Sequence, residues 1–159
     1  VLDAVRPPQA GPASVWREYE SNRPHYSESD LRAKREFVDG AVNRAVVRSV
    51  LDCGANAGEF SRIAAERGKR VVAADVDHGA LTRLYAEVRS SRADIQPLLL
   101  DVGRPTPAVG WMNREVPSFL DRSRGRFDCV YRSTAAHGKT IFWRYAPEYV
   151  KATGAKEYK

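Results

Sequence analysis

One stretch, residues 50–60, constrains the fold of this chain more than any other. An apolar run ends in an acidic residue and a turn of small residues, V-L-D-C-G-A-N-A-G-E-F, and a helical pattern follows as far as Gly68. This order predicts a strand, a glycine-rich turn and a helix, which lets backbone N–H groups at a helix N-terminus approach a ligand closely. Gly54 and Gly58 supply bare backbone for a tight turn, and Asn56 tolerates a positive φ.

The turn is spaced as D-x-G-x-N-x-G, with Asp52 just before it. It therefore differs from the G-x-G-x-x-G fingerprint of dinucleotide-binding domains. An ordinary strand-to-helix turn of another α/β protein is the alternative interpretation of this stretch. The turn alone does not distinguish the two.

Two further apolar runs, R-V-V-A-A-D and I-Q-P-L-L-L-D, also end in an aspartate. Asp75 lies about 20 residues beyond the turn, where a carboxylate of a nucleotide-binding βαβ unit accepts hydrogen bonds from ribose hydroxyls. The plainer alternative is that Asp75 or Asp77 caps the next helix. Because strands alternate with helices, we expect a parallel sheet with Asp52, Asp75 and Asp101 at its carboxyl edge.

Composition and pattern divide the chain into four parts. We expect a flexible lead-in, an N-terminal helical segment, an α/β domain and a polar tail, over residues 1–13, 14–47, 48–145 and 146–159. The length of 159 residues suits one domain, and 43% hydrophobic and 29% charged residues are typical of a globular protein. No apolar run approaches the ~20 residues of a membrane span, and the first residues do not resemble a signal peptide, so we expect a cytoplasmic location.

Periodicity predicts the remaining elements. Ser27 to Asp30 offer N-cap chemistry for a helix whose apolar stripe continues to Val46. Two helices and two strands are expected further on, at 79–90, 111–120, 126–131 and 139–145. Cys53 and Cys129 fall in apolar runs, where buried free thiols are expected. No spacing of His or Cys matches a metal site, so no metal is predicted.

Together these motifs resemble the S-adenosylmethionine-binding half of the class I methyltransferases. Motif I is V-L-D-C-G-A-N-A-G-E-F, motif II is V-V-A-A-D-V-D, motif III is L-L-L-D-V, and F-D-C-V is similar to the start of motif IV. The segments N-R-P-H-Y-S-E-S-D-L-R-A-K-R-E-F-V and G-W-M-N-R-E are similar, more narrowly, to a bacterial nodulation-related subgroup. The resemblance implies a Rossmann-like fold, with a mostly parallel sheet and helices on both faces. It also implies S-adenosyl-L-methionine as the cofactor.

The resemblance implies a set of cofactor-binding residues, which are Asp52, Gly54, Asn56, Gly58, Phe60, Asp75, Val76, Asp101, Val102 and Trp111. By position, Gly54 and Gly58 pass close to the methionine moiety. Asp52 organises the turn and the amino group, and Asp75 binds the ribose hydroxyls.

The adenine end of the cofactor falls to residues after the third strand. By resemblance, Asp101 and the backbone of Val102 recognise the adenine amino group and ring. Trp111 packs on the adenine or lines the acceptor side, and an aromatic plug of the core is an equally good interpretation.

The resemblance weakens after Tyr131. In the family, the loop after the fourth strand carries much of the acceptor site, and three further strands follow. Here R-S-T-A-A-H-G leads directly into K-T-I-F-W-R-Y, which is similar to the antiparallel last strand. The fold is therefore expected to be shortened after strand four. His137 has a suitable unperturbed pKa for a general base, but an exposed loop histidine is the alternative and no catalytic residue is assigned.

The implied reaction is in-line methyl transfer, with a small-molecule acceptor preferred over RNA. The net charge of +6 permits an RNA substrate, although arginine on a solvated surface also accounts for it, and no aromatic-and-basic RNA-binding module is present. A cofactor-binding domain without a complete acceptor site is a third possibility. The sequence does not indicate the oligomeric state.

Overall fold

A computed structural model describes residues 27–133 and 140–145 of the chain. Five strands of this part form one sheet in the order β3-β2-β1-β4-β5. Their bounds are β1 Ser49–Cys53, β2 Arg70–Asp75, β3 Ile95–Leu99, β4 Cys129–Ser133 and β5 Thr140–Tyr145. The first four are parallel, and β5 runs antiparallel beside β4. The prediction of a mostly parallel, Rossmann-like sheet is confirmed.

Several predictions from the sequence lie outside the described residues. They concern the lead-in at 1–13, the first part of the helical segment, the loop that contains His137, and the polar tail at 146–159.

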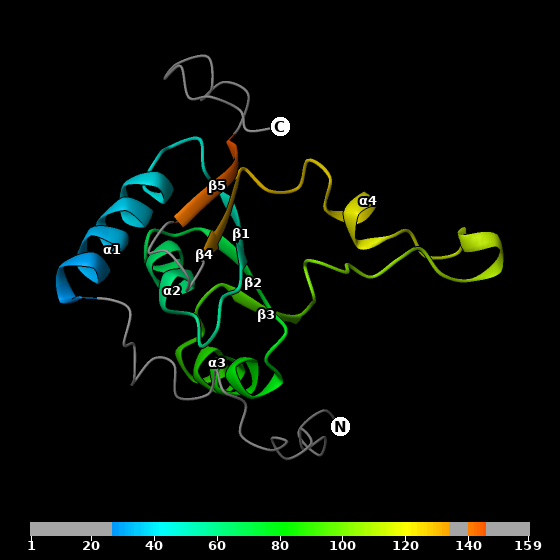
Figure 1. Ribbon diagram of the computed structural model, residues 1–159, viewed down its shortest axis with the longest axis horizontal. Coiled ribbons are helices and arrows are strands. Elements are labelled where there is room, and N and C mark those ends of the chain that lie inside the picture. Colours follow the sequence, from blue (N-terminus) through cyan, green and yellow to red (C-terminus); the bar gives the residue numbers. More distant parts are fainter. Residues whose placement is uncertain (1–26, 134–139, 146–159) are drawn as a thin grey trace.

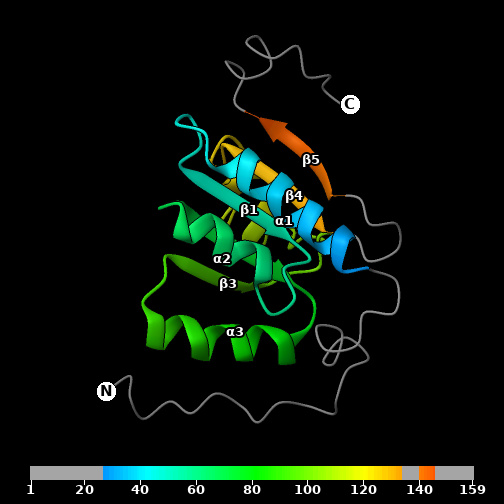
Figure 2. The same ribbon diagram turned by 90° about the vertical axis from the view of Figure 1, so that its left-hand side faces the viewer.

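The helices cover the two faces of the sheet unequally. α1 (Glu28–Val42), α2 (Glu59–Glu66) and α3 (His78–Ser91) lie along one face, whereas the short α4 (Phe119–Ser123) lies on the other (Figures 1 and 2). The β1-α2-β2 and β2-α3-β3 units place their helices on the same face because parallel crossovers share one handedness. All five residues of β1 are buried, as expected for a central strand that is covered on both sides.

Each face of the sheet has its own apolar cluster. Under the three helices, the cluster includes Val38, Val50, Val71, Leu84 and Tyr131. On the other face, Leu51, Cys53, Ala74 and Leu100 are buried, with Val102, Phe119, Phe127 and the half-buried Leu98 and Val130 packed around them. Cys53 and Cys129 are buried free thiols, as predicted, and burial raises the pKa of each to about 12.

The N-cap predicted within Ser27 to Asp30 is confirmed, and the capping residue is Ser27. Ser27 Oγ accepts a hydrogen bond from the Asp30 backbone N–H at 3.2 Å, and Asp30 Oδ2 accepts one from the Ser27 N–H at 3.1 Å, which forms a capping box. The helix ends at Val42, earlier than the predicted stripe, and Val46 is 47% exposed. The first strand begins at Ser49.

The helix predicted over 111–120 is wrong. The chain instead forms a 3₁₀ turn, η2 (Trp111–Asn113), and then α4. A bridge between Val109 and Val116 closes the turn, and Met112 has a φ of 53°, outside the helical region. Pro117 lacks the N–H that a continuous helix would need here. The fourth strand is also displaced, since it begins at Cys129 rather than at 126.

Because β4 begins at Cys129, Asp128 directly precedes this strand, and its side chain connects the starts of β1 and β4. Its Oδ2 accepts hydrogen bonds from the N–H groups of Arg48 (2.9 Å) and Ser49 (3.0 Å) and from Ser49 Oγ (2.9 Å). Burial raises the pKa of Asp128, but these hydrogen bonds outweigh it and the net pKa is lowered.

We expect Asp128→Ala to lower the free energy of unfolding by about 2 kcal/mol, because it leaves two backbone donors and a hydroxyl without this acceptor. Urea unfolding at pH 7 measures the change. Asp94→Ala is the matched control, since Asp94 precedes β3 in the same way and its side chain is exposed. An equal loss in the two variants would contradict the role assigned to Asp128.

Candidate functional site

The glycine-rich turn adopts the left-handed conformations expected of it. Gly54, Asn56 and Gly58 have φ values of 80°, 48° and 87°. The N–H groups of Gly54 and Ala55 both donate to the Ala74 carbonyl, at 2.8 and 3.1 Å, which fastens the turn to the end of β2. The helix α2 begins at Glu59, and its N-cap residue, Gly58, provides no capping side chain. The turn therefore brings bare backbone and the start of a helix to the carboxyl edge of the sheet.

Asp75 ends β2 and is bound to this turn through its carboxylate. Oδ2 accepts a hydrogen bond from the Asn56 N–H at 2.8 Å, and Oδ1 accepts one from the Asp77 N–H at 2.8 Å. Asp77, and not Asp75, caps α3, since Asp77 Oδ1 accepts from the Ala80 N–H at 2.9 Å. An ionised carboxylate has about four lone-pair sites, so the half-buried Asp75 keeps acceptor capacity for a ligand.

Asp52 lies within β1 and is fully buried beneath the turn. Ser61 Oγ donates to its Oδ2 at 2.6 Å, and Tyr131 is its register partner on β4. Burial raises the pKa of Asp52 to about 7; hydrogen bonds from Ser61 and Tyr131 oppose this rise, the charge of Asp75 adds to it, and that of Lys34 opposes it. Asp52 is thus a carboxyl group that ionises near neutral pH inside the protein.

Sequence reasoning missed three residues of this buried group: Lys34, Ser61 and Tyr131. Lys34 is only 7% exposed, and its Nζ lies 4.8 Å from the centre of the Phe60 ring, at the first turn of α2. Its spacing of three from Leu31 and four from Val38 places it on the apolar face of α1, and that spacing was a usable signal. For Ser61 and Tyr131, no local sequence pattern indicates that they lie beside Asp52.

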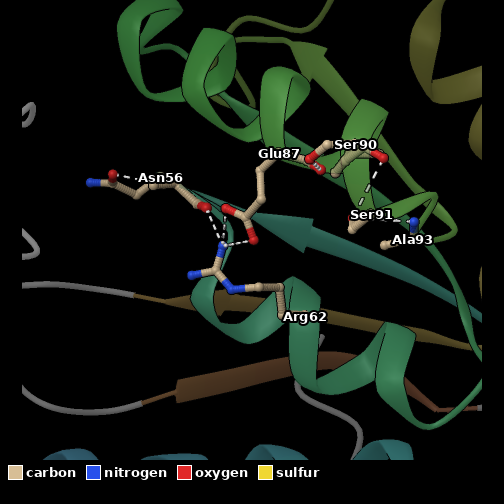
Figure 3. A network of polar contacts seen from close by, with 8 residues as sticks. Asn56, Arg62, Glu87, Ser90, Ser91 and Ala93 are labelled. Carbon is tan, nitrogen blue, oxygen red and sulfur yellow. Dashed lines mark hydrogen bonds and ion pairs between the residues drawn. The ribbon is translucent and has the colours of Figure 1, made fainter.

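A second set of polar contacts holds the outer side of the turn, as Figure 3 shows. Arg62 Nη1 donates to the Ala57 carbonyl at 2.9 Å and pairs with the Glu87 carboxylate at 3.1 Å. Arg62 therefore joins the turn, α2 and α3. The Asn56 side chain points away from Arg62 in Figure 3, and its Oδ1 accepts from the Ala57 N–H at 2.7 Å.

Asp101 and Val102, the predicted residues after β3, follow a segment that is hydrogen-bonded to the end of β2. The N–H of Leu100 donates to the Asp75 carbonyl at 2.9 Å, which holds this segment beside β2. Asp101 is exposed, and its Oδ1 accepts from the Gly103 N–H at 2.8 Å. Val102 is half-buried.

Three other predicted residues differ in their surroundings. Phe60 is 8% exposed and belongs to the core, whereas Val76 is 59% exposed at the end of β2. Trp111 is 79% exposed, in a segment that stands clear of the sheet at the yellow-green end of the molecule (Figure 1). The structure brings most of the set together at the glycine turn, but it does not bring Trp111 there.

Two absences concern only the part of the chain that the structure describes. Residues 27–133 and 140–145 contain no group of three His, Cys, Asp or Glu side chains arranged to hold a metal ion. Within the same ranges, no helix has both the length and the apolar character needed to cross a membrane.

Comparison with known proteins gives one curated relative. The chain is 32% identical over 113 residues to nodulation protein NoeA of Rhizobium meliloti (strain 1021), an alignment that covers 70% of this chain. The chain spans about a quarter (24%) of that relative's length. No protein-family model matches the chain.

Several solved structures are similar to this one. They include a SAM-dependent methyltransferase from Agrobacterium tumefaciens, at a TM-score of 0.48 and 18% identity over 67% of this chain and 32% of that chain. Coclaurine N-methyltransferase has a TM-score of 0.43 and 20% identity over 51% and 24%. The 23S rRNA methyltransferase ErmE has a TM-score of 0.43 and 13% identity over 64% and 45%.

The sheet order, the two parallel βαβ units and the glycine turn are observations on this chain itself. The chain has a Rossmann-like α/β fold, and its motifs resemble those of the class I S-adenosylmethionine-dependent methyltransferases.

Proposed function

We propose that this chain binds S-adenosyl-L-methionine at the carboxyl edge of its sheet and forms the cofactor-binding part of a methyltransferase. One observation carries the proposal: the Asp75 carboxylate lies 2.8 Å from the Asn56 N–H of the left-handed glycine turn. An acidic acceptor and bare backbone therefore meet at the edge where ligands of open α/β sheets bind.

Each part of this edge suits one part of the cofactor. Asp75 retains lone pairs for two ribose hydroxyls, which are hydrogen-bond donors. The turn at Gly54 and Gly58 lets the methionine end approach the backbone closely. Asp101 and Val102 follow at the β3 end, which leaves the adenine to them.

The chemistry depends mainly on position. When bound, the cofactor supplies a methyl group that is already activated on a sulfonium. The chain must hold it in line with an acceptor, and such positioning contributes several of the ~7–11 kcal/mol available from proximity. The structure describes no general base for the acceptor, and His137 lies outside the described residues.

Binding of S-adenosylhomocysteine to wild type and Asp75→Ala tests the cofactor site. We expect the dissociation constant to rise at least about tenfold in the variant, because one charge-assisted hydrogen bond contributes roughly 1.5–3 kcal/mol. Calorimetric titration measures it, and circular dichroism checks the fold. Asp75→Asn keeps one acceptor for the turn, and Asp94→Ala, far from the turn in sequence and exposed, should bind like wild type. Unchanged affinity in both Asp75 variants would contradict the ribose assignment.

We propose a small-molecule acceptor, and RNA is the second candidate because the net charge is +6. RNA affinity that falls steeply with added salt would support the second candidate, since phosphate contacts release counterions. The absence of RNA binding at low salt would exclude it. Cofactor binding without transfer to either kind of acceptor would leave a cofactor-binding domain without a complete acceptor site.

A further inference from the structure

The Arg62 side chain connects the glycine turn with α3. From α2, its Nη1 donates to the Ala57 carbonyl at 2.9 Å and to the two carboxylate oxygens of Glu87 at 3.2 and 3.1 Å (Figure 3). The backbone N–H of Arg62 donates to the Gly58 carbonyl at 2.9 Å. One residue therefore holds two successive carbonyl groups of the turn, and Glu87 holds its guanidinium group.

The peptide group between Ala57 and Gly58 is fixed at both of its ends. Its carbonyl accepts from Arg62, and its N–H, which belongs to Gly58, donates to the Ala55 carbonyl at 2.8 Å. The φ of Gly58 is 87° and changes whenever this peptide group rotates. Because glycine adopts positive and negative φ about equally, this peptide group can turn over when nothing holds its carbonyl. Arg62 thus removes a freedom that the glycine introduces.

The orientation of this peptide group matters for the proposed cofactor site. The Asn56 N–H, which donates to Asp75 Oδ2 at 2.8 Å, belongs to the residue directly before Ala57. A ligand that binds one conformation of the turn loses affinity in proportion to the fraction of molecules in other conformations. A residue that raises the fraction in the binding conformation therefore strengthens binding without touching the ligand.

We propose that Arg62 is a positioning residue, which holds the peptide group between Ala57 and Gly58 in the orientation that binds the cofactor, and that Glu87 holds Arg62 in place. This inference rests on the proposed function. A guanidinium group suits the task because its several fixed donors serve a carbonyl and a carboxylate together. The Arg62 and Glu87 side chains are 34% and 51% exposed, and exposed ion pairs contribute little to overall stability. The loss of Arg62 should therefore affect ligand affinity more than unfolding.

Arg67→Ala is the matched control for Arg62→Ala. Arg67 lies at the other end of α2 and pairs with Asp39 of α1 at 2.6 Å, so its loss also removes one ion pair from this helix. Calorimetric titration with S-adenosylhomocysteine should give a dissociation constant about fivefold higher in Arg62→Ala, the size expected for one hydrogen bond, and unchanged in Arg67→Ala. Urea unfolding should show a loss no larger in Arg62→Ala than in Arg67→Ala. Arg62→Lys, which keeps the charge without the planar group, should bind with intermediate affinity.

Amide hydrogen exchange of the ligand-free protein gives a second measurement. The Gly58 N–H belongs to the peptide group that Arg62 holds. We expect it to exchange severalfold faster in Arg62→Ala than in wild type or in Arg67→Ala, because the turn opens locally. Glu87→Ala should have a smaller effect in the same direction. Added to Arg62→Ala, it should have none, since Glu87 acts through Arg62.

The outcomes separate this inference from the proposed function. If wild type binds the ligand and Arg62→Ala binds equally well, or if exchange at Gly58 is unchanged, the positioning role is wrong and the cofactor site stands. An equal loss of affinity in Arg62→Ala and Arg67→Ala would also overturn it, since the effect would then follow stability and not the turn. If folded wild-type protein binds no ligand, the proposed function is wrong and the positioning role falls with it.

Discussion

Gly58→Ala is expected to lower the free energy of unfolding by about 3 kcal/mol or more. Gly58 has a φ of 87°, and a Cβ built there would lie 2.5 Å from Leu84 Cδ1. The left-handed conformation costs a residue with a Cβ roughly 1–2 kcal/mol, and overpacking a core costs typically 1–3 kcal/mol more. Leu84 is fully buried, so it has little room to move aside. Urea unfolding measures the change.

Gly68→Ala is the matched control for this prediction. Gly68 has a φ of 71° and no atom within 4 Å of its Cβ position, so only the conformational cost remains. The difference between the two variants isolates the clash with Leu84. Equal losses would show that α3 does not pack on the turn as described. A double-mutant cycle with Leu84→Ala should give a loss smaller than the sum of the single losses.

Asp52→Asn is expected to make the protein more stable than wild type at pH 8.5, but not at pH 4. Burial raises the pKa of Asp52 from 3.8 to about 7. The folded state thus binds this proton more tightly than the unfolded state does. Its contribution to stability is complete below pH 3.8 and is lost as the pH rises through 7. The amide is nearly isosteric and carries no charge to bury.

The full contribution is on the order of 4 kcal/mol, since each pKa unit corresponds to about 1.36 kcal/mol. Urea unfolding of both proteins at several pH values between 4 and 8.5 measures this contribution. The difference in free energy of unfolding between the variant and wild type should grow as the pH rises. A difference independent of pH would show that Asp52 is ionised throughout this range. Asp128 has the opposite sign: its pKa is lowered in the fold, so its contribution is present above pH 3.8 and fades as the pH falls below it. It therefore serves as an internal comparison.

Local chemistry explains the features that could be predicted from the sequence. The capping box at Ser27, the left-handed Asn56 and the acidic end of β2 each depend on residues close together in the chain. Such patterns are read from spacing alone. The alternation of strands and helices then determined the parallel sheet, because parallel strands need crossovers.

Contacts between distant residues could not be predicted in this way. Tyr131 lies beside Asp52 only because β4 pairs with β1. Paired residues of these two strands, such as Val50 and Cys129, are 79 positions apart in the sequence. The helix predicted over 111–120 was wrong for a different reason, since the apolar residues of this segment fit a helical period locally. Pro117 and the bridge at Val109 override that period, and only Pro117 was visible in the sequence.

The connection between β3 and β4 has two structurally distinct parts, one packed against the sheet and one projecting from it. Phe119 and Phe127 pack against the second face of the sheet. Residues 103–118 leave that face and form an arm, closed by the bridge between Val109 and Val116, that stands clear of the sheet (Figure 1). Because the arm is closed by its own bonds at Thr106 and Phe119, changes at its tip need not disturb strand register. In evolutionary terms, scaffold and tip can diverge separately. A lineage can alter what the tip contacts while the glycine turn, Asp52 and Asp75 remain as they are.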